Sequence, residues 1–209
     1  MRIKIFSIIL FTFICSCAPI EDNIKEERLS LRVIDTGERD ILLVDDFDEG
    51  THKNYLGGGF GAWDYRPYDR TQSASVYYTR KEKLGEKGLS VAIKYDVDSP
   101  SVAFNGFWMK LNGVDVSSYN KLVFWIKPDP KKGCTKIFKI ELKNKAGEVG
   151  KYYIKGIKIG EWQQIIIPLS EFEGISSFNE MDEFVIVFED RIVTQKVGKL
   201  YLDMIYFSK

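Results

Sequence analysis

Hydrophobic and polar residues alternate along most of the chain after residue 40. Between residues 89 and 97, apolar side chains occupy every second position, and the same spacing recurs in residues 122–127 and 137–143. This spacing buries one face of a β-strand and leaves the other face in water. Further strands are predicted at residues 42–48, 75–80, 102–111, 150–155, 162–168, 184–189 and 200–207.

Turn-forming residues separate these segments, for example at residues 112–113 and 128–130. No stretch keeps a helical spacing of apolar residues over more than a couple of turns. Many short strands separated by turns are typical of an all-β sandwich. The pattern therefore predicts one all-β domain of about ten antiparallel strands over residues 41–209.

Residues 1–16 have the character of an export signal. Arg2 and Lys4 precede a mostly apolar run, which suits the hydrophobic part of a signal peptide and is too short to span a bilayer. The run ends in Ile14-Cys15-Ser16-Cys17, which resembles the lipobox of bacterial lipoproteins. That resemblance implies cleavage before Cys17, a lipid on its thiol and attachment to a membrane. The alternatives are an ordinary secretory signal cleaved nearby and a short N-terminal anchor.

Residues 17–40 are polar and mixed in charge, and we interpret them as the lipidated N-terminus followed by a flexible tether. Ala18 follows Cys17, so the chain lacks the acidic retention signal of some inner-membrane lipoproteins. This favours the outer membrane or the cell surface of a bacterial envelope. Once Cys15 is removed and Cys17 carries lipid, Cys134 is the one cysteine left, and we interpret it as a passive thiol.

Composition limits the classes of function. The chain has 30 Lys and Arg residues against 30 Asp and Glu residues, so it offers no basic surface of the kind that nucleic acid needs. Its 44% of hydrophobic residues supply enough apolar surface for a folded core. His52 is the only histidine and lies beside an acidic first strand. This disfavours a catalytic triad and a metal site with several histidines.

Five motifs follow one another in a recognisable order along the predicted domain. They are LVDDFD at residues 43–48, NYLGGGFGAW at 54–63, DVSSYNKLVFWIK at 115–127, WQQIIIPLSEF at 162–172 and LYLDMI at 200–205. Together they resemble the galactose-binding-like jelly rolls typified by family 11 and family 30 carbohydrate-binding modules. More distantly, they resemble the complex I intermediate-associated family. The first resemblance implies a jelly-roll β-sandwich that binds a poly- or oligosaccharide without cutting it.

The resemblance also implies that a sugar binds on the concave sheet. A pyranose offers a C–H face that stacks on aromatic rings and hydroxyl groups that take hydrogen bonds. The alternative for any single tryptophan is a place in the core, which is the commoner position of an aromatic residue. Strand alternation selects Trp108, Lys110, Trp125, Lys139 and Glu141 as candidates on one surface, with Trp63, Tyr65, Tyr68 and Arg66 at its rim.

Acidic residues in the first and last strands are candidates for a structural calcium ion, which the resemblance implies. Asp46 and Asp48 lie in the first strand, and Asp203 lies within an apolar last strand, where an unpaired carboxylate is costly to bury. Carboxylate oxygens are the ligands that calcium prefers. The alternative is that these acids face solvent or meet Lys, Arg or backbone donors.

Two other functions stay open at this point. A structural or assembly protein would use the same sheet to bind a protein partner in a surface complex. A small glycoside hydrolase would need only two suitably spaced carboxylates. Residues 57–62 also match a dinucleotide-binding pattern by letter, but no strand-to-helix unit surrounds them. We interpret them as a loop whose glycines allow unusual dihedral angles or a close approach to another strand.

Overall fold

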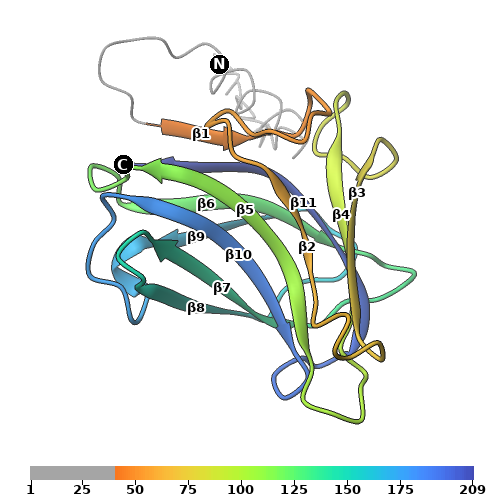
Figure 1. The fold of residues 1–209 in the computed structure, drawn as a ribbon. Coiled ribbons are helices and arrows are strands. Elements are labelled where there is room, and N and C mark those ends of the chain that lie inside the picture. The colour runs from red at the N-terminus through yellow and green to blue at the C-terminus, as the bar shows by residue number, and fades with distance from the viewer. Residues whose placement is uncertain (1–40) are drawn as a thin grey trace, which may run out of the picture.

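The computed structural model describes residues 41–209, so the predicted signal peptide, Cys17 and the tether lie outside the described residues. No helix within residues 41–209 is long and apolar enough to cross a membrane. These residues form eleven strands and one 3-10 turn (Figure 1). The elements are β1 (Ile41–Asp45), β2 (Phe60–Trp63), β3 (Ser73–Thr79), β4 (Ser90–Asp96), β5 (Phe104–Val114), β6 (Lys121–Pro128), β7 (Ile137–Asn144), β8 (Val149–Lys155), β9 (Gln163–Pro168), η1 (Leu169–Glu171), β10 (Met181–Glu189) and β11 (Val197–Ser208).

The strands form two antiparallel sheets that pack face to face. One sheet has five strands in the order β2-β5-β10-β7-β8. The other has six, in the order β3-β4-β11-β6-β9, with β1 also paired to β11. Figure 1 shows β5 and β10 as long, bent strands in the middle of the five-stranded sheet. The all-β prediction is confirmed, and the architecture is a jelly-roll β-sandwich.

The core lies between the two sheets and is built from the apolar faces of the strands. It is rich in phenylalanine, and each of these rings is buried. Burying a side chain of this size stabilises the fold by about 1.5–3 kcal/mol relative to leaving it exposed. The core rings include Phe107, Phe138, Phe184 and Phe188 from the five-stranded sheet and Phe124 from the six-stranded sheet.

All ten predicted strands are present, with boundaries shifted by a few residues. The strand that the sequence pattern missed is β2, within the segment interpreted as a loop. Two of its four residues are Gly61 and Ala62, which are too small to show hydrophobic alternation. Pairing with β5 makes it a strand despite this weak local pattern. The expected close approach of this segment to another strand is confirmed, because a Cβ at Gly58 would lie 2.1 Å from the Lys110 carbonyl oxygen.

A second apolar cluster covers part of the outer face of the six-stranded sheet. Trp125 is 9% exposed there and packs with Leu84, Val123, Met204 and Tyr206. The partly buried Trp162 packs against the same cluster. Two of the four tryptophans of the chain therefore lie on the outer side of the six-stranded sheet, away from the five-stranded one.

Candidate functional site

The outward face of the five-stranded sheet gathers most of the predicted site residues. Phe107 and Met109 point into the core, so Trp108 and Lys110, which alternate with them on β5, point outward. The same alternation turns Lys139 and Glu141 outward on β7. The register places Val185 of β10 directly between Trp108 and Glu141. Side chains from three neighbouring strands thus share one surface.

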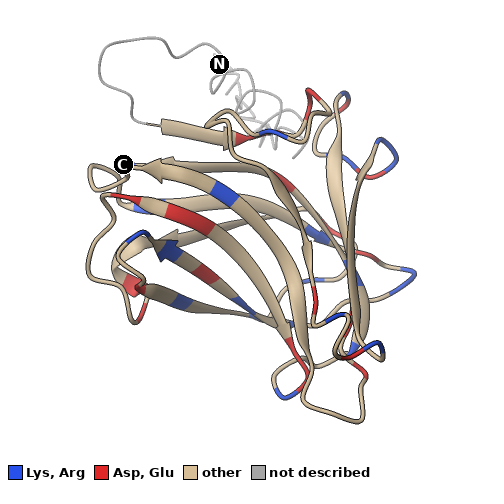
Figure 2. Cartoon of the chain, viewed as in Figure 1, with Lys and Arg blue, Asp and Glu red and all other residues tan. Residues whose placement is uncertain are grey.

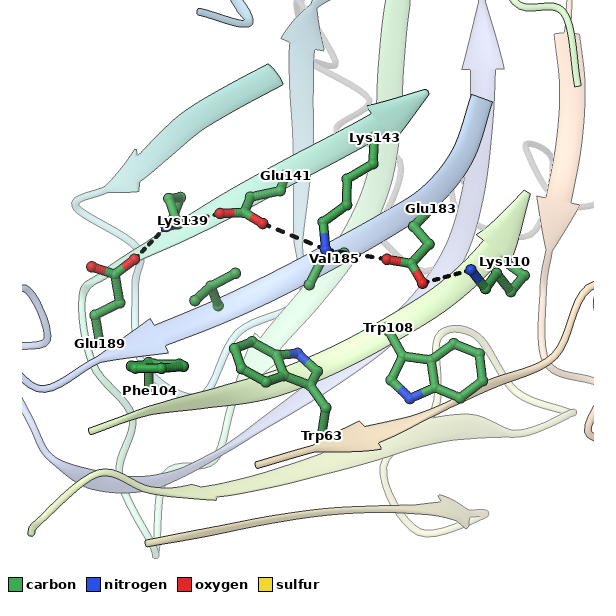
Figure 3. A pocket seen from close by; sticks show the side chains of 11 residues that line it. Trp63, Phe104, Trp108, Lys110, Lys139, Glu141, Lys143, Glu183, Val185 and Glu189 are labelled. Carbon is green, nitrogen blue, oxygen red and sulfur yellow. Dashed lines mark ion pairs between the residues drawn. The ribbon is translucent and has the colours of Figure 1, made fainter. Parts of the chain in front are cut away.

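These outward side chains surround a groove of about 610 Å³ (Figure 3). One side of the groove is aromatic, and the opposite side is charged. Val185 and Val187 of β10 lie between the two sides. The lining residues are Trp63, Phe104, Trp108, Lys110, Lys139, Glu141, Lys143, Glu183, Val185, Val187 and Glu189.

The aromatic side is built on two cross-strand pairs of glycine and tryptophan. Gly61 of β2 lies opposite Trp108 of β5, and Trp63 of β2 lies opposite Gly106 of β5. A Cβ added at Gly61 would lie 3.2 Å from three atoms of the Trp108 indole. A Cβ at Gly106 would lie 3.4 Å from Trp63 Nε1. Each indole therefore rests against the backbone of a glycine, as aromatic residues do beside strand glycines.

Phe104 extends the aromatic side along β5. Its ring centroid lies 6.0 Å from that of Trp63, within the range of favourable aromatic contacts. The Trp63 indole nitrogen is buried and makes no hydrogen bond to the part of the chain that the structure describes. Trp63 thus contributes its ring to this side of the groove.

The charged side is a row of six side chains whose charges alternate, which we call the ion-pair row. Figure 2 shows positively charged positions on β5 and β7 and negatively charged positions on β10 and β7. Each lysine of the row contacts at least two carboxylates. In order, the row consists of Lys110, Glu183, Lys143, Glu141, Lys139 and Glu189 (Figure 3).

The ion pairs within the row are close. Lys139 lies 2.8 Å from Glu141 and also contacts Glu189. Lys143 lies 3.2 Å from Glu183 and 4.0 Å from Glu141. The side chains of Lys139 and Glu141 are only 12% and 14% exposed. Such partly buried pairs hold one another in place more firmly than pairs that are fully in solvent.

Contacts within the row favour the charged forms of Lys139 and Glu183. Burial lowers the pKa of Lys139, but hydrogen bonds to Glu141 and Glu189 outweigh burial, so the pKa lies above its usual value. Burial raises the pKa of Glu183, yet hydrogen bonds from Lys110 and Lys143 bring it below its usual value. The Glu183 carboxylate therefore favours its ionised form, which accepts hydrogen bonds.

Most of the predicted sugar-contacting residues come together in this groove. Trp63, Trp108, Lys110, Lys139 and Glu141 all line it. Sequence reasoning missed six lining residues, although the alternation in residues 184–189 carried a signal for the outward positions of β10. The missed residues are Phe104, Lys143, Glu183, Val185, Val187 and Glu189.

The prediction that Trp125 shares this surface is wrong. Trp125 does point away from the main core, as alternation indicated, but β6 belongs to the six-stranded sheet. Its indole is buried in the apolar cluster on the outer side of that sheet. Alternation tells which residues share a strand face, but it does not tell which sheet a strand joins.

The two rim tyrosines lie beyond one end of the groove, in the loop between β2 and β3. Tyr65 is 49% exposed, and its ring contacts that of Phe104. Arg66 binds Asp64 and is mostly exposed. Arg66 lies at a separate pocket formed with β3 and β4 and is absent from the lining of the groove.

The predicted calcium ligands take hydrogen bonds from nearby donors. Asp48 accepts one from the Leu89 backbone, and Asp203 accepts one from the Leu84 backbone. Asp46 accepts one from the Tyr55 hydroxyl. Within residues 41–209, no three His, Cys, Asp or Glu side chains are arranged as a metal site. The calcium ion stays a prediction.

Asp45, which was not among the predicted ligands, has a strongly perturbed carboxylate at the end of β1. It is 5% exposed, and its Oδ2 atom makes no hydrogen bond to the described residues. Burial first, and then the negative charges of Asp46 and Asp48, raise its pKa to about 7. The favourable bond from the Phe47 backbone to Oδ1 only partly offsets these effects.

Cys134 has the environment of an unreactive thiol. It is 3% exposed and unpaired with another described cysteine. Burial raises its pKa to about 12, so the nucleophilic thiolate is disfavoured. The interpretation of Cys134 as a passive thiol agrees with this environment.

Comparison with known proteins assigns the chain to a family. Residues 36–183 match the family described as "Carbohydrate binding domain (family 11)". A family 11 module from Clostridium thermocellum, solved with a β-1,3-1,4-mixed-linked tetrasaccharide, has a TM-score of 0.60 and 19% sequence identity. That match covers 80% of this chain and 95% of the module.

Two further solved structures share the fold. The family 11 module of a cellulosomal cellulase of Clostridium thermocellum has a TM-score of 0.58 and 20% identity, covering 80% of this chain and 94% of that one. An exo-β-agarase has a TM-score of 0.53 and 11% identity, covering 80% of this chain and 24% of the agarase chain. No curated protein matches the sequence.

Proposed function

The chain belongs to the family 11 carbohydrate-binding domains, and on this basis we propose that the groove binds a segment of a polysaccharide without cutting it. The observation that carries the proposal is the pairing of two indoles with an ion-pair row across one groove. A pyranose ring has an apolar C–H face and an edge of hydroxyl groups. The aromatic side suits the first, and the ion-pair row suits the second.

The charge of the groove favours an uncharged glycan. The lining contains three lysines and three glutamates, and every one of these lysines already contacts carboxylates of the row or its neighbour Asp182. An anionic glycan would compete with these carboxylates for the lysines and would be repelled by them. Hydroxyl groups can accept from lysine and donate to glutamate at once, so they fit the row without breaking it.

The same row disfavours hydrolysis by the groove. A glycosidase needs one protonated carboxyl group to act as its general acid, with its pKa raised. Glu183 instead has a lowered pKa, and Glu141 and Glu189 both contact Lys139. These arrangements support a binding role over a catalytic one for the domain.

A protein partner is the less favoured ligand for this surface. Interfaces that hold protein partners are depleted of charged residues at their centre. Here six charged side chains occupy one side of the groove. The charged side of the groove therefore favours a glycan over a protein as its ligand.

Affinity electrophoresis tests the proposed function. The purified full-length chain would be run through gels that contain neutral polysaccharides, among them mixed-linked β-1,3-1,4-glucan, and one anionic polysaccharide. We expect retardation by at least one neutral polysaccharide and its loss in the Trp63→Ala, Trp108→Ala double variant. The matched control is Tyr77→Ala, since Tyr77 is exposed on β3 of the six-stranded sheet. Unchanged mobility in every gel, or equal retardation of the double variant, would contradict the proposal.

We also propose that the chain is a lipoprotein of the bacterial envelope, anchored through Cys17. The support is the apolar run that ends in the lipobox-like Ile14-Cys15-Ser16-Cys17. Mass spectrometry of the N-terminal peptide from cells would find Cys17 acylated at the new N-terminus. We also expect the Cys17→Ser variant to appear in the soluble fraction of the cells. An unmodified N-terminal peptide from the wild-type protein would overturn the proposal. Fractionation of the membranes would then test the outer-membrane location.

A structural calcium ion is a further proposal for the first strand. The donor chemistry fits a hard cation, because Asp45 has a buried oxygen without a hydrogen bond from the described residues and feels the charges of Asp46 and Asp48. A bound cation would relieve this repulsion. The test is a calorimetric titration with calcium of protein from which metal ions have been removed by a chelator. The absence of any heat of binding with the wild-type protein would contradict the calcium proposal.

A further inference from the structure

Aromatic contacts continue from the groove onto the loop between β2 and β3. The Phe104 ring, which lines the groove, lies 5.9 Å from the Tyr65 ring. The Tyr65 ring lies 5.4 Å from the Tyr68 ring. Together with the contact of 6.0 Å between Trp63 and Phe104, these rings form an unbroken series of four from the sheet to the loop.

The outer members of this series are strongly exposed. Tyr65 is 49% exposed and Tyr68 is 83% exposed, against 38% for Phe104. Exposed aromatic rings in a contiguous series are uncommon on soluble proteins and typically mark a binding surface. Tyrosine suits contact with a sugar because it offers a flat apolar ring and a hydroxyl group that both donates and accepts.

Hydrogen bonds hold the loop in a defined conformation. Asp69 accepts from the backbone and hydroxyl of Thr71, from Gln72 Nε2 at 3.0 Å and from the Ser99 hydroxyl. These bonds lower the pKa of Asp69 to about 2. The Gln72 side chain also accepts from the Phe104 backbone at 3.1 Å. The tyrosine loop is thus joined to the first residue of β5, where the groove ends.

A second carboxylate fixes the start of the loop. Asp64 accepts bonds from the backbone and side chain of Arg66 and from the Ala74 backbone at 3.2 Å. Arg66 Nη2 lies 2.6 Å from Asp64. Because the backbone on both sides of Tyr65 and Tyr68 is tied down in this way, little order has to be gained when a ligand settles on the rings.

We propose that Tyr65 and Tyr68 form an extension subsite that binds the same glycan chain where it leaves the groove beyond Phe104. The inference rests on the proposed function of the groove. It also sets the direction of the ligand, because the ring series runs along β2 and β5 toward their loops. A bound chain lies along these strands, with further sugar units over the loop.

The extension subsite predicts that affinity depends on chain length in a way that the groove alone does not. An oligosaccharide that only fills the groove would not reach Tyr68. A longer one would cover both tyrosines and gain their contacts. We expect these contacts to raise the affinity about tenfold, which is about what one or two aromatic contacts contribute.

The test compares short and long ligands on one loop variant. Oligosaccharides of increasing length would be prepared from the polysaccharide that retards wild-type protein most strongly in the gels described above. Their affinities for the full-length chain and for the Tyr65→Ala, Tyr68→Ala double variant would be measured by calorimetry. We expect wild-type affinity to rise with length beyond that of the shortest bound oligosaccharide. The double variant should bind the shortest oligosaccharide as wild type does and lose about tenfold on the longest.

The control variant is Tyr77→Ala, which removes another exposed tyrosine, from the six-stranded sheet. It should match wild type at every length. Equal affinity of the double variant and wild type for the longest oligosaccharide overturns the extension subsite and leaves the groove intact. Equal loss at all lengths also overturns it, because the tyrosines would then act within the groove. Failure of every polysaccharide to retard wild-type protein contradicts the groove itself, and the extension subsite with it.

Discussion

Replacing Gly61 would displace the Trp108 indole without removing any side chain that lines the groove. The nearest atoms to a Cβ at this position are three atoms of the indole at 3.2 Å. Carbon atoms in favourable contact are about 3.5–4.0 Å apart. Alanine must therefore push the indole by about 0.5 Å, and the additional methyl groups of valine leave no room for it in its present place.

The expected loss of affinity follows from that displacement. A tryptophan at the centre of a binding site is worth about 2 kcal/mol, or about thirtyfold in Kd. A shift of about 0.5 Å forfeits a quarter to a half of the dispersion attraction. Gly61→Ala should then weaken binding about two- to fivefold, whereas Gly61→Val should approach the thirtyfold loss of Trp108→Ala.

Fold stability should change little in the alanine variant. Replacing a strand glycine with alanine stabilises by about 0.5–1 kcal/mol, which offsets the strain of a moved side chain, about 0.5–1.5 kcal/mol. Gly59→Ala is the matched control. The nearest atoms to a Cβ at Gly59 are the His52 carbonyl oxygen at 3.6 Å and the edge of the Trp108 indole at 3.9 Å, which are ordinary contacts.

Calorimetry with the retained polysaccharide, together with thermal unfolding, would measure both effects. We expect Gly59→Ala to bind with the affinity of wild type. Gly61→Ala should bind more weakly than these two, and Gly61→Val most weakly of the four proteins. In a Trp108→Ala background, Gly61→Val should cause no further loss. Wild-type affinity in Gly61→Val, or the same loss with and without Trp108, would refute the role of this glycine as the seat of the indole.

Three further predictions address other parts of the molecule. Trp125→Ala should lower the free energy of unfolding in urea by about 3 kcal/mol, the cost of emptying a buried tryptophan site, and leave the affinity of the folded protein unchanged; a weaker affinity would place Trp125 in the ligand site after all. Lys139→Met should weaken binding, because Glu141 and Glu189 lose the cation that they share and that holds them in place; an affinity equal to that of wild type in calorimetry would contradict this. The raised pKa of Asp45 means that folding favours its protonated form. With calcium removed by a chelator, the contribution of this group to the free energy of unfolding should therefore fall as the pH rises from 3.8 to about 7. An Asp45→Asn variant with the same pH profile as wild type would show that another group is responsible.

Most of the fold could be predicted from the sequence, because nearly every strand buries one of its faces. Alternation located ten strands and also told which side chains point away from the core, as with Trp108 and Lys139. It failed at β2, where glycine and alanine carry no periodic signal. There the strand exists through its pairing with β5, a contact between distant parts of the chain.

The site was harder to predict than the fold because it depends on which strands become neighbours. Trp108 and Trp125 have the same local pattern, a tryptophan two residues before a lysine on the outward face of a strand. Only the strand order separates them, since β5 and β6 join different sheets. Glu183 and Glu189 became recognisable as site residues once β10 was found between β5 and β7.

The most direct measurement uses the fluorescence of the groove tryptophans. Of the four tryptophans, Trp125 and Trp162 lie in the second apolar cluster. Replacing both with phenylalanine would leave Trp63 and Trp108 as the only indoles. Titration of this variant with the retained polysaccharide should give a saturable change in tryptophan emission, with the same Kd as calorimetry. Binding by calorimetry with unchanged emission would mean that the glycan binds elsewhere, and it would contradict the assignment of this groove as the carbohydrate site.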